Sequence, residues 1–203
     1  MVELYLVRHP RTDANKSKIV QGTIDSKLEK GWETEADLTA KFLAERGSFD
    51  AVFTSDLSRA DITGRRVVDY LRRRQEGPLE YHSIPDLRER HWGKYQGKPY
   101  EEVPHGSHNI LDYLFLLDSI AKGENLSAVR ERIERFRREH FGRFDGSSAR
   151  VGIVGHSYWL NYFRNLVVDG SVIGGNGYVN LPHLSVRLLE FYGSLTRDKG
   201  LIK

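Results

Sequence analysis

The stretch Leu4-Tyr-Leu-Val-Arg8-His9-Pro10-Arg11-Thr12 joins an apolar run to an arginine and a histidine. The run at residues 2–7 predicts a buried strand of a sheet that is covered on both faces. Open α/β sheets place their chemistry at the carboxyl ends of strands, which is where Arg8 and His9 stand. Arginine offers a planar fork of donors to phosphate or carboxylate oxygens, and a neighbouring imidazole can act as a nucleophile or proton carrier. Taken alone, the pair indicates either an anion site or a capping or salt-bridge feature at the strand end.

Composition favours one soluble globular domain over residues 1–203, with 39% hydrophobic and 29% charged residues. The apolar stretches fall short of the ~20 residues that span a bilayer, so no membrane partner is expected. The chain has no cysteine, which excludes disulfides and thiol nucleophiles. With no visible leader peptide, a cytoplasmic location is expected. A net charge of +3 and a pI near 9.0 favour anionic substrates and give little indication of a nucleic-acid partner.

Apolar segments alternate along the chain between strand-like and helix-like patterns. Such alternation predicts an α/β fold, a three-layer α/β/α sandwich with a mostly parallel central sheet. Strands are expected at residues 2–7, 50–54, 80–84, 150–154 and 184–192, the last of the chain, and helices at 34–46, about 58–74, 109–121, 126–140 and about 157–167.

A helical insertion is expected within the segment from about 86 to 141. It contains two consecutive helical patterns with no strand between them, which indicates a cap over the site and a region that sets substrate specificity. The loop at residues 8–30 is long for a compact domain, so it is expected to form one wall of the pocket.

Asn15 lies six residues after His9, and Arg59, Glu89 and His156 follow in the segments 54–60, 87–93 and 151–157. Together and in this order, these motifs resemble the histidine phosphatase superfamily, in its phosphoglycerate mutase-like group. That family's nucleophile motif runs Arg-His-Gly-x-Thr-x-x-Asn, and Arg8, His9, Thr12 and Asn15 fall in register with it. The resemblance extends from about residue 2 to residue 191.

The resemblance implies a role for each of five residues. His9 would attack phosphorus to form a phosphohistidine, while Arg8 and Arg59 would hold the phosphoryl oxygens. His156 would donate to the same group, and Glu89 would serve as general acid and then general base. Each of Arg59, His156 and Glu89 could alternatively be structural: a helix arginine, a core histidine, or a partner for a neighbouring arginine.

The proposed chemistry sets local requirements on these groups. A hydrogen bond from one ring nitrogen of His9 to a backbone carbonyl would keep the other nitrogen free to attack. Burial would raise the pKa of Glu89 so that it can act as an acid. The helix start at Ser157 would point amides at a bound anion. No metal or other cofactor is expected, because two arginines and a histidinium would supply the positive charge.

Five further residues are candidates for substrate or phosphate binding: Asn15, Gln21, Gly22, Arg90 and Ser157. The sequence departs from the family pattern at Pro10, which replaces the usual glycine and lacks an amide proton. It also departs at residues 157–158, where serine and tyrosine replace residues that are often glycine. Both departures bear on substrate shape. The pair His105 and His108 has too few accompanying ligands for a metal site, so a surface loop is expected there.

The expected activity is hydrolysis of a small phosphomonoester. This phosphorylated substrate is the one partner that we expect. The segment 89–93, Glu-Arg-His-Trp-Gly, also resembles the Glu-Arg-His-Tyr-Gly of cofactor-dependent phosphoglycerate mutases. That group uses a tandem arginine in the following insertion, whereas residues 100–122 contain no arginine. A mutase is therefore the first alternative, and a non-catalytic binder of phosphorylated ligands is the second. Substrate identity and oligomeric state stay open.

Overall fold

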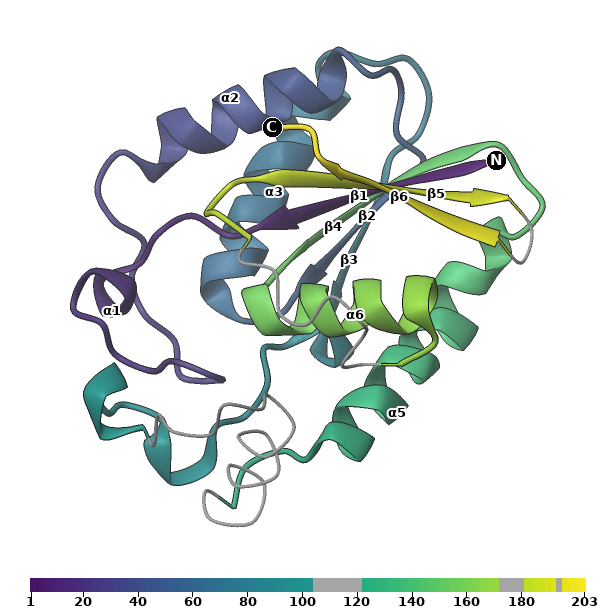
Figure 1. The fold of residues 1–203 in the computed structure, drawn as a ribbon. Helices are drawn as coiled ribbons and strands as arrows, with labels where there is room; N and C mark the ends of the chain where they lie inside the picture. Colours follow the sequence, from purple (N-terminus) through teal and green to yellow (C-terminus); the bar gives the residue numbers. More distant parts are fainter. Residues whose placement is uncertain (104–121, 172–180, 193–194) are drawn as a thin grey trace.

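The computed structural model describes residues 1–103, 122–171, 181–192 and 195–203, which are built around one mixed sheet (Figure 1). The strand order is β3-β2-β4-β1-β5-β6. Strands β3, β2, β4 and β1 run parallel, while β5 runs antiparallel to both β1 and β6. The predicted α/β fold with a mostly parallel sheet is confirmed. The strands are β1 (Val2–Arg8), β2 (Ala51–Ser55), β3 (Glu80–Ile84), β4 (Ala149–Gly155), β5 (Val186–Tyr192) and β6 (Leu195–Leu201).

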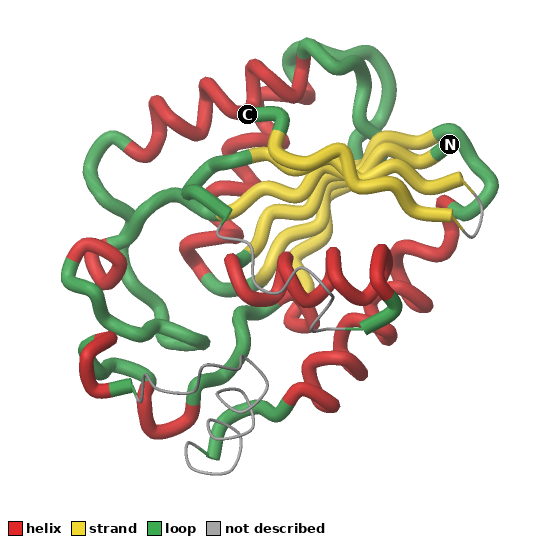
Figure 2. The backbone as a smooth tube through the Cα atoms, viewed as in Figure 1, coloured by secondary structure: helices red, strands yellow, loops and turns green. Residues whose placement is uncertain are grey.

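Helices cover both faces of this sheet (Figures 1 and 2). Helices α2 and α3 lie on one face, and α5 and α6 lie on the other. Short 3-10 turns occupy Pro85–Leu87, Gly93–Tyr95, Tyr100–Glu102 and Gly142–Phe144. The helices are α1 (Asp13–Lys16), α2 (Trp32–Ala44), α3 (Ser58–Arg72), α5 (Leu126–Phe136), with a π-helical turn at Arg137–Phe141, and α6 (Ser157–Asp169).

Alternate side chains of β1 enter two different cores. Leu4 and Leu6 pack with residues of α5 and α6, whereas Tyr5 and Val7 pack with residues of α2 and α3. All four are almost fully buried. A strand that is apolar on both faces is what a sheet covered by helices on both sides requires, so the reading of the first stretch as a central strand is confirmed.

The prediction that the strand at residues 184–192 is the last was wrong, because β6 follows it. Strand β6 reads Leu-Thr-Arg-Asp-Lys-Gly-Leu, and its side chains alternate between exposed and half-buried. It lies at the edge of the sheet, where few apolar residues are needed, so it lacks the apolar signal on which the other strands were identified.

The segment after residue 86 divides between the core and the surface. Helix α5 buries Val129, Ile133 and Phe136 in the core beneath the sheet. The helix expected at 109–121 and the pair His105 and His108 lie outside the described residues, so the cap over the site stays a prediction. Within the described ranges, no helix has the length and apolar character needed to cross a membrane.

Candidate active site

Strand register brings the two candidate histidines together. Strands β1 and β4 pair in parallel with Arg8 opposite Gly155, and the backbone N–H of His9 donates to the Gly155 carbonyl at 3.0 Å. Each histidine therefore follows the same end of neighbouring strands. The His9 and His156 rings lie with their centroids 5.2 Å apart. The structure thus places His9 and His156 side by side at the carboxyl ends of two neighbouring strands.

The His9 ring is held in one orientation by the backbone of the next residue. Its Nδ1 lies 2.6 Å from the Pro10 carbonyl oxygen. A carbonyl can only accept, so Nδ1 carries the proton and Nε2 keeps its lone pair. Burial, reinforced by the charges of Arg59 and Arg8, holds the pKa of His9 well below its ordinary value. The predicted hydrogen bond from His9 to a backbone carbonyl is thus present, and the carbonyl of Pro10 is its acceptor.

His156 is fully buried beside His9. Neither of its ring nitrogens has a hydrogen-bond partner within the described part of the chain. Burial and then the charges of Arg59, His9 and Arg8 hold the pKa of His156 well below its ordinary value. This lowered pKa favours the neutral imidazole, and an approaching anion would favour the protonated form.

The two candidate arginines approach the site from different elements. Arg8 ends β1 and donates through Nη1 to the Leu181 carbonyl at 2.5 Å. Arg59 lies in the first turn of α3 and is 1% exposed. Its Nη1 and Nη2 donate to the carbonyls of Ile24 and Gly22 at 2.9 and 2.7 Å, and its buried Nε has no acceptor among the described residues. The guanidinium of Arg59 is thereby fixed with one donor still unsatisfied.

Glu89 lies at the N-terminus of helix α6. Its Oε1 accepts from the amides of Arg90 and Trp159 at 2.9 and 3.0 Å, and its Oε2 accepts from the amide of Tyr158 at 3.1 Å. Burial raises the pKa of Glu89, although the three amides and Arg59 oppose the shift. The expected direction is confirmed. From the sequence we expected the amides at the start of this helix to point at a bound anion. In the structure, the amides of Tyr158 and Trp159 donate to Glu89.

The loop after β1 is ordered by its own polar groups. Thr12 caps α1 by accepting from the Asn15 amide, and the Asn15 carboxamide accepts from the Thr12 hydroxyl and amide. The Thr12 hydroxyl is also 3.0 Å from Gln21 Oε1. Gly22 adopts φ +54°, where a Cβ would lie 2.1 Å from Gln96 Oε1, so glycine is required there. This loop places Asn15 and Gln21 at the edge of the site.

These groups surround one cavity of about 840 Å³. Eight of the ten candidate residues line it, all except His156 and Arg90. His156 is fully buried next to His9. Among the described residues, Arg90 instead contacts the Glu124 carbonyl through Nε at 2.8 Å and the Tyr162 hydroxyl through Nη1 at 3.3 Å. Its predicted contact with substrate stays a prediction. The lining residues are Arg8, His9, Arg11, Asn15, Val20, Gln21, Gly22, Glu35, Arg59, Glu89, Trp92, Tyr100, Val103, Ser157, Tyr158, Pro182 and His183.

Sequence reasoning missed His183, the second histidine that lines the cavity. Its Nδ1 lies 3.0 Å from the His9 carbonyl oxygen, and its ring centroid is 5.5 Å from that of His9. Burial, with the charge of Arg8, lowers the pKa of His183 to about 4. The residue precedes β5, which is antiparallel to β1, so the start of one strand lies beside the end of the other. Only the direction of β5 could have pointed to this residue from the sequence.

Known proteins resemble this chain in sequence and in fold. A metal-independent phosphoserine phosphatase of Arabidopsis thaliana is 28% identical over 194 residues, which are 91% of this chain and 77% of that protein. A 2,3-bisphosphoglycerate-dependent phosphoglycerate mutase of Gloeothece citriformis is 30% identical over 155 residues, or 73% and 66% of the two chains. The solved mycobacterial glucosyl-3-phosphoglycerate phosphatase superposes with a TM-score of 0.80 at 20% identity and 97% coverage of both chains, and so shares the fold.

The family model that matches this chain spans nearly all of it. The model describes branch 1 of the histidine phosphatase superfamily and matches residues 4–197. That range contains every candidate residue of the cavity. The chain therefore belongs to the histidine phosphatase superfamily, branch 1.

Proposed function

We propose that this protein is a phosphatase that hydrolyses a small phosphomonoester through a phosphohistidine intermediate on His9. The observation that carries the proposal is the 2.6 Å contact between His9 Nδ1 and the Pro10 carbonyl. It leaves Nε2 unprotonated, as a nucleophile requires, in a cavity that Arg8, Arg59 and the buried carboxyl group of Glu89 also line. The phosphatases among its relatives agree with this reading.

In the first step, the Nε2 lone pair of His9 attacks phosphorus and the bond from phosphorus to the ester oxygen breaks. Arg8 and Arg59 bind the non-bridging oxygens, whose charge would also favour protonation of His156 as a further donor. Glu89 gives its proton to the departing oxygen, so the alcohol leaves neutral. Because Oε2 accepts only one of the three amide bonds, that oxygen has room to carry the proton.

In the second step, water attacks the phosphohistidine. Glu89, now a carboxylate, takes a proton from that water as the P–N bond breaks. Inorganic phosphate leaves, His9 recovers its lone pair, and Glu89 is again protonated. The raised pKa of Glu89 suits both halves of this cycle, since the group must hold a proton in one step and accept one in the other.

The test is release of phosphate from p-nitrophenyl phosphate. We expect His9→Ala to lower kcat/KM by about 10⁴-fold or more, and Glu89→Gln by about 10²- to 10⁴-fold. His82→Ala and Glu134→Gln are matched controls, because both residues lie outside the cavity. The proposal fails if phosphate release survives His9→Ala.

A mutase is the second candidate, favoured by the 30% identical phosphoglycerate mutase relative. It would transfer the phosphoryl group back to a substrate hydroxyl rather than to water. The buried contacts of Arg90 and the lack of arginine at residues 100–122 count against it. Interconversion of phosphoglycerates that depends on a bisphosphoglycerate primer would favour the mutase. Binding of phosphate esters with neither hydrolysis nor transfer would favour a non-catalytic binder.

A further inference from the structure

The cavity is far larger than one phosphoryl group, and its lining divides into two chemically different parts. We call the first part the phosphate side; it consists of Arg8, His9, Arg11, Arg59 and His183. We call the second part the aromatic wall; it consists of Val20, Trp92, Tyr100, Val103 and Tyr158. The part of a substrate that lies beyond its phosphate must contact the aromatic wall.

Glu89 marks the direction in which the leaving group points. On the proposed function, on which this inference rests, Glu89 protonates the ester oxygen, so the leaving group departs past this carboxyl group. The Glu89 Oε2 is bonded to the amide of Tyr158, at 3.1 Å. The Tyr158 ring in turn packs against Trp92, with centroids 4.7 Å apart and planes at 73°. The leaving group therefore extends from the acid onto this pair of rings.

The aromatic wall is a packed surface. Trp92 and Val103 are buried in a small cluster with Tyr95, and Val20 and Tyr158 pack against it. The wall is also backed by Arg90, whose guanidinium carbon lies 4.8 Å from the Trp92 ring centroid. These contacts hold the rings in place before any ligand arrives, which lowers the entropy that binding would cost.

The charge of the lining opposes a second anion at this end. The arginines that line the cavity all belong to the phosphate side. Arg90 directs its donors to the Glu124 carbonyl and the Tyr162 hydroxyl. A carboxylate or second phosphate next to the aromatic wall would have to lose water there, and the five residues of the wall offer it no cation.

We infer that the natural substrate is a phosphomonoester whose leaving group carries an aromatic or similarly flat apolar body, and that the aromatic wall selects it. Acidic leaving groups such as those of phosphoglycerates bind worse. The wall thus supplies specificity, while the phosphate side supplies the chemistry that any phosphate ester would need.

The inference is tested with phosphonates, which bind without turnover because a carbon replaces the ester oxygen. Benzylphosphonate, methylphosphonate and phosphonoacetate are titrated calorimetrically. We expect benzylphosphonate to bind about tenfold more tightly than methylphosphonate, or about 1.4 kcal/mol, and phosphonoacetate to bind no more tightly than methylphosphonate. Equal affinity for benzyl and methyl, or a preference for phosphonoacetate, would overturn the inference.

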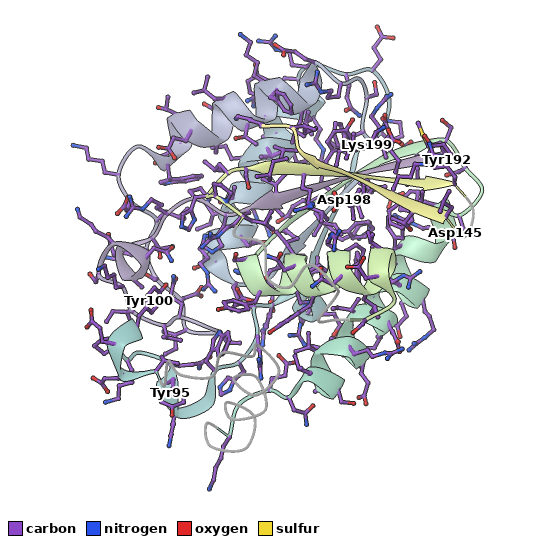
Figure 3. All side chains as sticks on the ribbon, viewed as in Figure 1. Tyr95, Tyr100, Asp145, Tyr192, Asp198 and Lys199 are labelled. Carbon is purple, nitrogen blue, oxygen red and sulfur yellow. The ribbon has the colours of Figure 1, made fainter. Side chains whose placement is uncertain are left out.

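Variants of the aromatic wall test whether a preference for benzylphosphonate over methylphosphonate depends on its tyrosines. Tyr158→Ala should reduce the benzyl-to-methyl affinity ratio to about twofold. Tyr100→Ala should reduce it to about fourfold, and since Tyr100 is 40% exposed this change should not endanger folding. Tyr192→Ala is the matched control, a tyrosine of similar exposure, 42%, at the opposite end of the molecule (Figure 3). If the benzyl-to-methyl affinity ratio is the same in Tyr158→Ala, Tyr100→Ala and Tyr192→Ala, the aromatic wall is not the surface that selects the leaving group.

Turnover separates this inference from the proposed function. If p-nitrophenyl phosphate is hydrolysed and the benzyl preference is absent, the phosphatase stands and the aromatic selection falls. If the benzyl preference is present and depends on Tyr158 but no ester is hydrolysed, the proposed chemistry falls while the wall retains its assignment as the selective surface.

Discussion

The two parts of the cavity lining are held by different kinds of structure. On the phosphate side, Arg8 and His9 stand at the end of a central strand, and pairing with β4 fixes their position relative to His156. The aromatic wall comes mainly from the segment of short turns between Arg88 and Val103, which is not part of the sheet. Strand ends thus carry Arg8 and His9, whereas most of the aromatic wall is carried by irregular turns.

One side chain joins the two parts. The Gln96 Oε1 accepts from the Thr23 amide at 2.8 Å and from the Trp92 amide at 3.2 Å. Thr23 follows the loop glycine next to the phosphate side, and Trp92 belongs to the aromatic wall. The sheet thus positions Arg8, His9 and His156, whereas a few contacts between loops position the wall to which we assign specificity. Apart from changes at Glu89, changes in the turn segment should alter substrate choice more readily than they alter the chemistry.

Outside His9 and Glu89, the largest effect is expected from Arg59→Ala. Removing this guanidinium deletes charge at the phosphoryl oxygens, so kcat/KM for p-nitrophenyl phosphate should fall about 10³-fold, or about 4 kcal/mol. The matched control is Arg65→Ala, an exposed arginine of the same helix that pairs with Asp61. A loss of less than tenfold in Arg59→Ala would contradict the assignment of this arginine to the phosphate side.

The next effect is on the junction between the two parts, through Gly22→Ala. The new Cβ would lie 2.1 Å from Gln96 Oε1 and 3.0 Å from the Arg90 carbonyl, at φ +54°. We expect the free energy of unfolding, from urea titration, to fall by about 2–3 kcal/mol. Gly77→Ala is the control, since φ is +90° there but nothing lies within 4 Å. It should cost about 1 kcal/mol. Equal losses would mean that the contact with Gln96 does not matter.

A smaller effect concerns the pH dependence of stability on the phosphate side. Burial holds the pKa of His156 below its ordinary value, so the unfolded chain takes up a proton that the folded chain refuses. His156 therefore contributes full stability above pH ~6.5, and this contribution is lost as the pH falls toward its folded pKa.

Urea titrations at about pH 6.5 and 5.5 measure this contribution. Replacing His156 with asparagine should reduce the loss of unfolding free energy on acidification by up to about 1.4 kcal/mol per pH unit. His9 and His183 shift in the same direction, so some pH dependence should remain in the variant. A variant whose stability falls as steeply as that of the unaltered chain would show that His156 is not buried in its neutral form.

The smallest effect is expected at His183, which positions His9 through its backbone. His183→Leu removes the 3.0 Å contact with the His9 carbonyl and should lower kcat/KM about fivefold, or about 1 kcal/mol. His183→Asn offers a replacement donor and should recover most of that loss. If asparagine is as poor as leucine, the hydrogen bond is not the reason that His183 matters.

The difference between the two parts of the lining also explains how far the sequence could be read. Apolar runs ending in Arg8-His9 and in His156 predicted the strands and the sites at their ends, because burial on both faces of a sheet leaves a clear pattern. Strand β6 left no such pattern, since an edge strand can be polar.

The contacts of the turn segment could not be predicted in the same way. That Glu89 binds the amides of α6, and that Arg90 contacts the Glu124 carbonyl, depends on how irregular segments pack in three dimensions. No local spacing records such packing. On the phosphate side, Arg8, His9 and Arg59 could therefore be predicted, whereas His183 and the aromatic wall became visible only in the structure.

The central claim, that His9 carries the phosphoryl group, is tested most directly by trapping the intermediate. The protein is mixed with a ³²P-labelled ester, quenched in alkali within milliseconds, and digested for mass spectrometry. We expect a phosphoryl group that is stable to alkali, labile to acid and located on His9, and none in His9→Ala. Rapid turnover with no labelled protein, or a label on another residue, would contradict the account.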